Sequence, residues 1–239
     1  MKMVFMLLFL IIFQTLFPAN IAKIPLNDIL KDVSLLCLGS LGDLTLSYDA
    51  GLAAGYLLKQ QGYDAYVVGT LDTLSKDDKD PLNRVNVSAF ITAHVYSLFA
   101  RGLATAGIIP IFDGTILDKE VVVSLNTRDA TYPIVVDSEV KKNLLSELGY
   151  NGSVFLSNEI GKYIDGIKLS WKITNVDVES IRKKILKNSI VKLSDEKEIH
   201  INQPFVESGL LVFSNDPEIL RFAKDILDGY ENALGRRPW

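Results

Sequence analysis

The sequence predicts an α/β protein in which apolar strands alternate with helices. Apolar runs of strand length are separated by longer segments whose apolar residues recur at three- and four-residue spacing, the pattern of amphipathic helices. The strand-like runs are almost continuously apolar, which is typical of parallel strands buried on both faces. With 48% hydrophobic residues, the 239-residue chain is long enough for one large core. This alternation allows either a doubly wound sheet or a compact barrel.

The first 22 residues predict a secretory leader. Lys2 precedes the uncharged apolar run 3–17, and a proline and small residues follow that run. The run is short for a bilayer span, which needs about 20 residues, and it has the length of a signal-peptide core. Ala22 is the expected cleavage point, and an uncleaved membrane anchor is the alternative. We therefore expect a secreted, periplasmic or otherwise extracytoplasmic protein with a single folded domain over residues 23–239.

Strands and helices are expected in a regular order after the leader. The expected strands are residues 33–40, 64–71, 108–112, 153–157 and 209–214. The expected helices are residues 47–63, 87–107, 137–152, 176–188 and 216–234. The last helix has a clear start signal in Asp216-Pro217, because proline is favoured in the first helical turn. Residues 160–173 are left without an assignment.

Ligand sites in such folds lie at the carboxyl ends of the parallel strands. The polar residues expected at those ends are Asp43, Asp72, Asp113, Asn126, Arg128, Ser157, Asn158, Ser214 and Asp216. Asp113 directly follows the apolar run 108–112, so we ask whether its carboxylate takes part in chemistry.

Several kinds of chemistry are absent from the sequence. The formal net charge is −4 and the cations are dispersed, which argues against a nucleic-acid partner because counterion release needs clustered cations. No dinucleotide-binding glycine motif, phosphate loop or nucleophile elbow is present, and we expect no cofactor. His94, His200 and the single Cys37 are too scattered to predict a metal site.

Two segments resemble the N-terminal barrel domain of glycoside hydrolase family 3. Residues 72–114, DTLSKDDKDPLNRVNVSAFITAHVYSLFARGLATAGIIPIFDG, match the family's strand-end aspartate, its arginine-containing loop, its helix with a late glycine and the next strand. Residues 132–158, YPIVVDSEVKKNLLSELGYNGSVFLSN, match the helix and strand that deliver the family's catalytic aspartate. Residues 205–229 are similar to a later strand and helix. The resemblance implies a TIM-like (β/α) barrel, incomplete or irregular because the chain is short for eight βα units.

The residues that carry catalysis in that family are missing here. The family's Lys-His pair, which holds sugar hydroxyls, falls on Pro110 and Ile111. Its nucleophile falls on Ser157, or on Asn158 if one residue is inserted. A retaining glycosidase needs a carboxylate nucleophile and a second group as acid, and an amide or an unactivated hydroxyl is a poor replacement. Whether the chain is an enzyme therefore stays open at this point.

Four residues are expected to contact a ligand or to order the site. Arg84 matches an arginine that contacts substrate in the family, and an ion pair with the acidic loop 77–80 is the alternative. Asp72 matches a family aspartate that mostly orders the strand-end loop. Ser157 and Asn158 are expected to hydrogen-bond a bound sugar.

Asp113 and Glu159 are the candidates for a rebuilt catalytic carboxylate. Asp113 stands where the family has a proline, so the resemblance gives it no role, and we favour loop ordering or ligand contact over catalysis for it. Glu159 follows the expected nucleophile position directly.

We favour a secreted, catalytically degenerate relative of family 3 that binds a glycan, such as a cell-wall sugar, or a protein partner. An active, divergent β-glycosidase or β-N-acetylhexosaminidase that hydrolyses O-glycosyl bonds is the first alternative. An unrelated periplasmic small-molecule binding protein with two lobes and a hinge is the second. We expect membrane contact only through an uncleaved leader.

Overall fold

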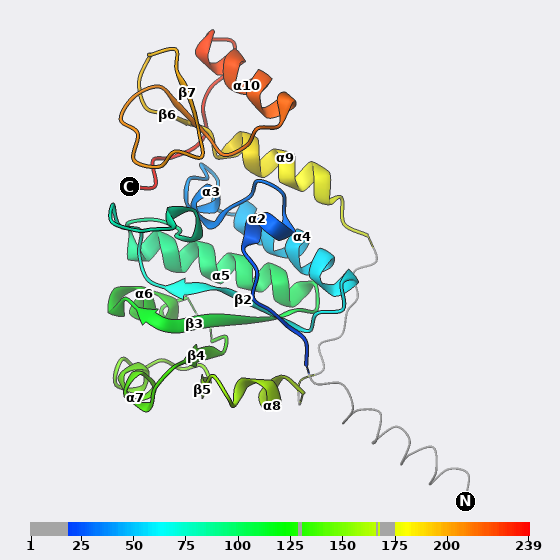
Figure 1. Cartoon of the computed structure of the whole chain (residues 1–239), viewed down its shortest axis with the longest axis vertical. Coiled ribbons are helices and arrows are strands. Elements are labelled where there is room, and N and C mark those ends of the chain that lie inside the picture. The colour runs from blue at the N-terminus through cyan, green and yellow to red at the C-terminus, as the bar shows by residue number, and fades with distance from the viewer. Residues whose placement is uncertain (1–18, 129–130, 166, 168–174) are drawn as a thin grey trace, which may run out of the picture.

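The structure is a computed structural model that describes residues 19–128, 131–165, 167 and 175–239. Its main feature is a five-stranded parallel sheet in the order β1-β2-β3-β4-β5 (Figure 1). The strands are β1 (Ile21–Ala22), β2 (Ala65–Leu71), β3 (Ile109–Leu117), β4 (Ile134–Val136) and β5 (Val154–Leu156). The predictions that the segments of β2, β3 and β5 form strands are confirmed, but β3 continues past Asp113 to Leu117 instead of ending before Asp113.

Helices connect these strands and follow the last of them. The connecting helices are α2 (Leu26–Ile29), α3 (Leu35–Gly39), α4 (Leu46–Gln60), the 3-10 helix η1 (Pro81–Asn83), α5 (Ala89–Thr105), α6 (Lys119–Asn126) and α7 (Glu139–Glu147). After β5 come α8 (Ile160–Asp165), α9 (Val178–Asn188) and α10 (Pro217–Leu227). Five of the segments expected to be helical therefore form α4, α5, α7, α9 and α10.

The crossover helices α4 to α7 share one core with one face of the sheet. Tyr66, Phe112 and Ile134 point into this core, where Phe99 of α5 and Leu125 of α6 are also buried. A doubly wound sheet has helices on both faces and reverses its strand order, whereas sequential order is that of neighbouring strands in a (β/α) barrel. The α/β prediction is confirmed. The described residues do not form a closed barrel, because β1 and β5 are the two edges of the sheet.

Glycines allow α4 and α5 to pack closely over the sheet (Figure 1). A Cβ atom at Gly51 would lie 2.0 Å from the carbonyl oxygen of Phe99, and one at Gly102 would lie 2.2 Å from that of Tyr48. Any larger side chain at either glycine would therefore push the helices apart.

The opposite face of the sheet is covered by α8. Ile160 and Ile164 pack there against Ala65, Ile109 and Ile111. In a closed barrel, this face would be covered by side chains from the remaining strands. Here one short helix takes their place, and the candidate site lies beyond Ile160, toward the carboxyl ends of the strands.

Residues 33–40 form a helix, and the prediction of a strand there is wrong. Helix α3 begins after Ser34, whose hydroxyl accepts a hydrogen bond from the Cys37 amide at 3.1 Å. All five residues of α3 are buried. A short apolar run buried on every side does not distinguish a strand from a helix.

The predicted leader overlaps the first strand of the sheet. Residues 1–18 lie outside the described residues, but Ile21 and Ala22 pair with Ala65 and Tyr66 of β2. Cleavage after Ala22 would therefore remove β1. Within the described residues, no helix is both long and apolar enough to span a membrane.

The last part of the chain forms a second sheet instead of further barrel strands. Its strands are β6 (Val191–Lys192), β7 (Ile199–Ile201) and β8 (Leu210–Val212), in the order β6-β8-β7. The strand expected at 209–214 is present as β8, but β6 pairs with it in antiparallel fashion. This small mixed sheet corrects the expectation that all strands belong to one parallel barrel.

Arg182 of α9 connects the second sheet region with the first. It is 5% exposed, and its guanidinium lies 2.7 Å from Asp216, 2.8 Å from Glu179 and 3.7 Å from Asp32. The hydrogen bond from Arg182 lowers the pKa of Asp216. Asp216 also caps α10 by accepting a hydrogen bond from the Glu218 amide at 2.9 Å, as the Asp-Pro start signal predicts. The single domain over 23–239 stays a prediction.

Candidate functional site

Two adjacent cavities lie where the parallel strands end. The inner cavity, of about 80 Å³, lies between the sheet and α8, and the outer pocket, of about 290 Å³, lies beside the loops that follow β1 and β2. Lys23, Val67 and Asp113 line both of them. The mouth of the sheet is thus one continuous candidate site with two compartments.

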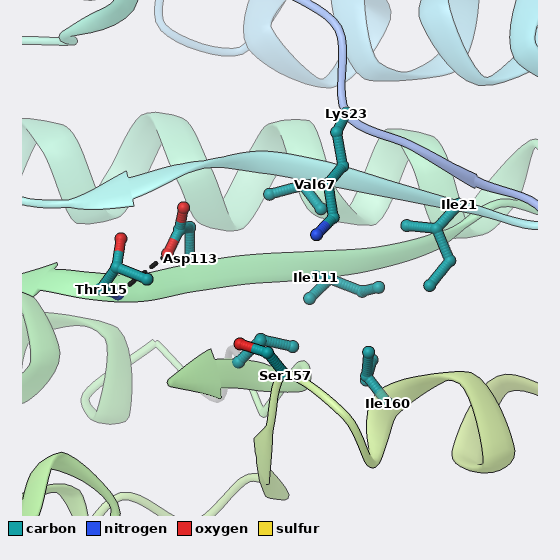
Figure 2. Close-up of a pocket in the computed structure, with 9 residues that line it drawn as sticks. Ile21, Lys23, Val67, Ile111, Asp113, Thr115, Ser157 and Ile160 are labelled. Atoms are coloured by element: carbon teal, nitrogen blue, oxygen red, sulfur yellow. Dashed lines mark hydrogen bonds between the residues drawn. The ribbon is translucent and has the colours of Figure 1, made fainter. Parts of the chain in front are cut away.

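Asp113 points into this site because of the strand period. Successive side chains of a strand point to opposite faces, so Ile109, Ile111 and Asp113 share the face turned toward α8, while Phe112 is buried in the helical core. One carboxylate oxygen of Asp113 accepts a hydrogen bond from the Thr115 amide at 2.8 Å (Figure 2). The other oxygen accepts no hydrogen bond from the described residues. Asp113 therefore orders the irregular part of β3 that follows it, where the pairing with β2 shifts register, and still offers an acceptor to the site.

Lys23 is a site residue that the sequence analysis missed. It follows β1 directly, and Figure 2 shows its side chain extending toward Val67 and Ile111. Lys23 forms no hydrogen bond or ion pair with another described residue. Its position depends on the pairing of β1 with β2, and the leader-like composition of the preceding residues gave no signal for that strand.

Arg84 lies at the outer pocket and is also held by acidic residues. Its Nε atom is 3.0 Å from Asp72 Oδ2 and 3.7 Å from Asp78 Oδ1. Asp72 accepts a hydrogen bond from the Thr70 hydroxyl at 2.6 Å and lines neither cavity. Arg84 thus combines an ion pair with a place in the pocket wall, and its contact with a ligand stays a prediction.

Glu159 lies away from the two cavities. One of its carboxylate oxygens accepts a hydrogen bond from the Leu156 amide at 2.9 Å and lies 3.6 Å from Lys142 Nζ on α7. The amide hydrogen bond, together with Lys142, lowers the pKa of Glu159. The structure therefore does not bring Glu159 together with Asp113.

Ser157 and Asn158 occupy different surroundings although they are adjacent in the chain. Ser157 lines the inner cavity, and its hydroxyl donates to the Val136 carbonyl at 3.2 Å. Asn158 is exposed and lines neither cavity. Sugar binding by these two residues stays a prediction.

The other polar candidates have structural partners away from the mouth, and the prediction of a strand end is wrong for Asp43, which follows α3, and for Asn126, which ends α6. Asp43 accepts hydrogen bonds from Thr45, Asn126 donates to Gly149, Arg128 contacts His94, and Ser214 and Asp216 join the Arg182 network. No group of three His, Cys, Asp or Glu side chains in the described part of the chain is placed to hold a metal ion.

The two positions that the resemblance aligns with the Lys-His pair of glycoside hydrolase family 3 carry apolar side chains on β3. Ile111 is fully buried and forms part of the inner cavity wall, and Pro110 is buried beside it in the strand. Neither side chain can donate a hydrogen bond to a sugar hydroxyl. Hydroxyl recognition at this mouth would therefore depend on residues from other strand ends.

Comparison with known proteins supports the fold and nothing finer. No protein-family model matches the chain, and no curated protein matches it. A solved structure, β-glucosidase 3B from Thermotoga neapolitana in complex with glycerol, is similar with a TM-score of 0.53 at 11% sequence identity. The match covers 70% of this chain and 38% of that one. At this identity the likeness shows an α/β fold shared with part of a glycoside hydrolase.

Proposed function

We propose that this chain is a non-catalytic relative of glycoside hydrolases that binds a small sugar at the mouth of its parallel sheet. One observation supports the loss of catalysis: Asp113 is the one acidic residue among those that line the two cavities. Glycoside hydrolysis by a carboxylate pair needs two carboxyl groups that flank the same glycosidic bond and lie about 5–10 Å apart. Glu159 is held by Leu156 and Lys142, so Asp113 has no partner of this kind in the cavity walls.

The outer pocket supplies the chemistry that recognises hydroxyl groups. Arg84 offers terminal N–H donors in a rigid planar fork, and Asp113 on β3 offers a free acceptor to the same pocket. The ion pair with Asp72 holds the guanidinium in place before a ligand arrives. A preorganised donor lowers the entropy lost on binding, which favours a weakly hydrophobic ligand such as a sugar.

Titration calorimetry of the full chain against simple and cell-wall sugars tests this proposal. We expect the parent protein to bind at least one of them, and Arg84→Ala to weaken that binding about tenfold or more. Arg84→Lys keeps the charge but not the fork and should recover part of the loss. Arg101→Ala, at an exposed arginine on α5 outside both cavities, is the matched control. Equal binding by the parent and Arg84→Ala, or no binding by the folded parent, would overturn the proposal.

We also propose that the leader takes the chain out of the cytoplasm. The apolar run 3–17 supports this, and the pairing of β1 favours a chain that keeps Ile21 and Ala22. Mass spectrometry of the protein from extracytoplasmic fractions should find a mature start at or before Ile21, or an intact leader. Recovery of the protein from the cytoplasm alone would contradict the proposal, and a start at Lys23 would show that β1 is dispensable.

A further inference from the structure

The inner cavity combines an apolar wall with two charges of opposite sign. The apolar part of the wall consists of Ile21, Val67, Ile111, Val135 and Ile160, and the hydroxyl-bearing Thr115 and Ser157 also line the cavity. Lys23 and Asp113 also line this cavity, and Figure 2 shows both side chains on the same side of the sheet. Within the described residues, no acidic side chain lies within 4.0 Å of the Lys23 ammonium, and this includes Asp113.

These two charges define what a complementary ligand must carry. A carboxylate would accept hydrogen bonds from Lys23, and an ammonium group would donate to the free oxygen of Asp113. A ligand with a charge of only one sign would pair with one of these residues and be repelled by the other. The rim therefore favours a small molecule that carries both groups close together.

The size of the cavity limits the rest of the ligand. An apolar cavity of ~150 Å³ holds a benzene molecule, so about 80 Å³ has room for roughly three or four carbon atoms. A branched alkyl group of that size matches the branched side chains of the wall. The charged end of the ligand would then lie where the inner cavity meets the larger outer pocket, beside Lys23 and Asp113.

We infer that the inner cavity binds a free α-amino acid with a small branched apolar side chain, of the valine or leucine type. Its carboxylate pairs with Lys23, its ammonium group pairs with Asp113, and its side chain lies against Val67, Ile111 and Ile160. This ligand class goes beyond the proposed sugar binding and does not depend on it, because Arg84 lines only the outer pocket and not the inner cavity.

Calorimetry of the full chain with leucine, 4-methylpentanoate and 3-methylbutylamine tests the inference. The two analogues each lack one charged group of leucine, and we expect the affinity of each to be at least about tenfold lower than that of leucine. Lys23→Met and Asp113→Asn should each weaken leucine binding by a similar factor. Lys119→Met, at an exposed lysine of α6 outside both cavities, should bind leucine like the parent.

The Arg84→Ala variant separates this inference from the sugar proposal. Leucine binding should be kept in this variant, while sugar binding should be about tenfold weaker or more. Absence of leucine and valine binding by the folded parent at millimolar concentration would overturn the inference. Equal binding of 4-methylpentanoate and leucine, or full binding by Lys23→Met, would overturn it as well. Leucine binding without any sugar binding would contradict the sugar proposal and leave this inference standing.

Discussion

Replacing Arg182 with methionine removes the cation from a buried ion network while keeping an unbranched apolar stem. Arg182 is 5% exposed, and the side chains of its partners Asp216 and Asp32 are 17% and 23% exposed. Removing one partner of a fully buried pair costs about 3–5 kcal/mol. Because water still reaches both carboxylates, we expect a smaller cost of about 2–3 kcal/mol in the free energy of unfolding.

Thermal unfolding followed by circular dichroism measures this cost. For a chain of this size, ~1 kcal/mol shifts Tm by ~2–4 °C, so the variant should melt ~4–12 °C below the parent. Arg182→Lys keeps the charge but not the forked hydrogen bonds, so its Tm should lie between those of the parent and Arg182→Met. Lys183→Met is the matched control, because Lys183 and Glu218 form an ion pair at the surface with side chains 35% and 44% exposed, and the Tm of this variant should stay close to that of the parent.

The pH dependence gives the same prediction a second readout. Arg182 lowers the pKa of folded Asp216, so the stability that this pair contributes is present at neutral pH. The unfolded pKa of an aspartate is about 4, and the pKa of folded Asp216 is lower. The stability from this pair is lost as the pH falls from the first of these values through the second. The difference between parent and variant should therefore narrow in acid. A Tm within about 2 °C of the parent at pH 7, or a difference that grows in acid, would refute this reasoning. A parent that melts in two separate steps would instead contradict the single domain.

Three further predictions concern helix packing, the first strand and a histidine. Gly102→Ala places a methyl group against the Tyr48 carbonyl and should destabilise the protein by about 1–3 kcal/mol in urea unfolding, so an unchanged midpoint would disprove the tight α4–α5 contact. A chain that starts at residue 23 instead of 19 loses β1 and should be about 2–4 kcal/mol less stable, whereas equal stability would mean that β1 contributes little. Burial and Arg128 lower the pKa of His94, so stability should fall as the pH drops below about 6.5 through that lowered value. His94→Gln should reduce this dependence, and a variant with the full dependence would assign it to another group.

Local pattern predicted the elements that are partly buried and regularly spaced. The strand segments of β2 and β3 are bounded by turn residues, and α4 and α5 show a clear helical spacing of apolar residues. α3 was mistaken for a strand because all its residues are buried, so no polar face reveals the period. The number of strands in the sheet was also not predictable from local pattern, because the pairing that makes β5 the edge strand depends on contacts between residues far apart in the sequence.

The site was predictable only where one strand determines it. The direction of the Asp113 side chain follows from the two-residue alternation of β3, although β3 runs on to Leu117 and does not end before Asp113 as predicted. Lys23 reaches the same mouth through the pairing of β1 with β2, which no local signal announces. Glu159 follows the position where a nucleophile was expected, yet the turn after β5 directs its carboxylate to the Leu156 amide. The direction of a side chain in a short turn is set by that turn's own hydrogen bonds, and spacing alone does not give it.

Hydrolysis of aryl β-glycosides by the full chain tests the loss of catalysis most directly. A glucoside, a xyloside and an N-acetylglucosaminide cover the activities that the family resemblance implies. Because Asp113 has no second carboxylate in the cavity walls, we predict background rates for the folded parent and for Asp113→Asn alike. Turnover well above background that is lost in Asp113→Asn or Glu159→Gln would show a rebuilt active site and contradict the proposed function.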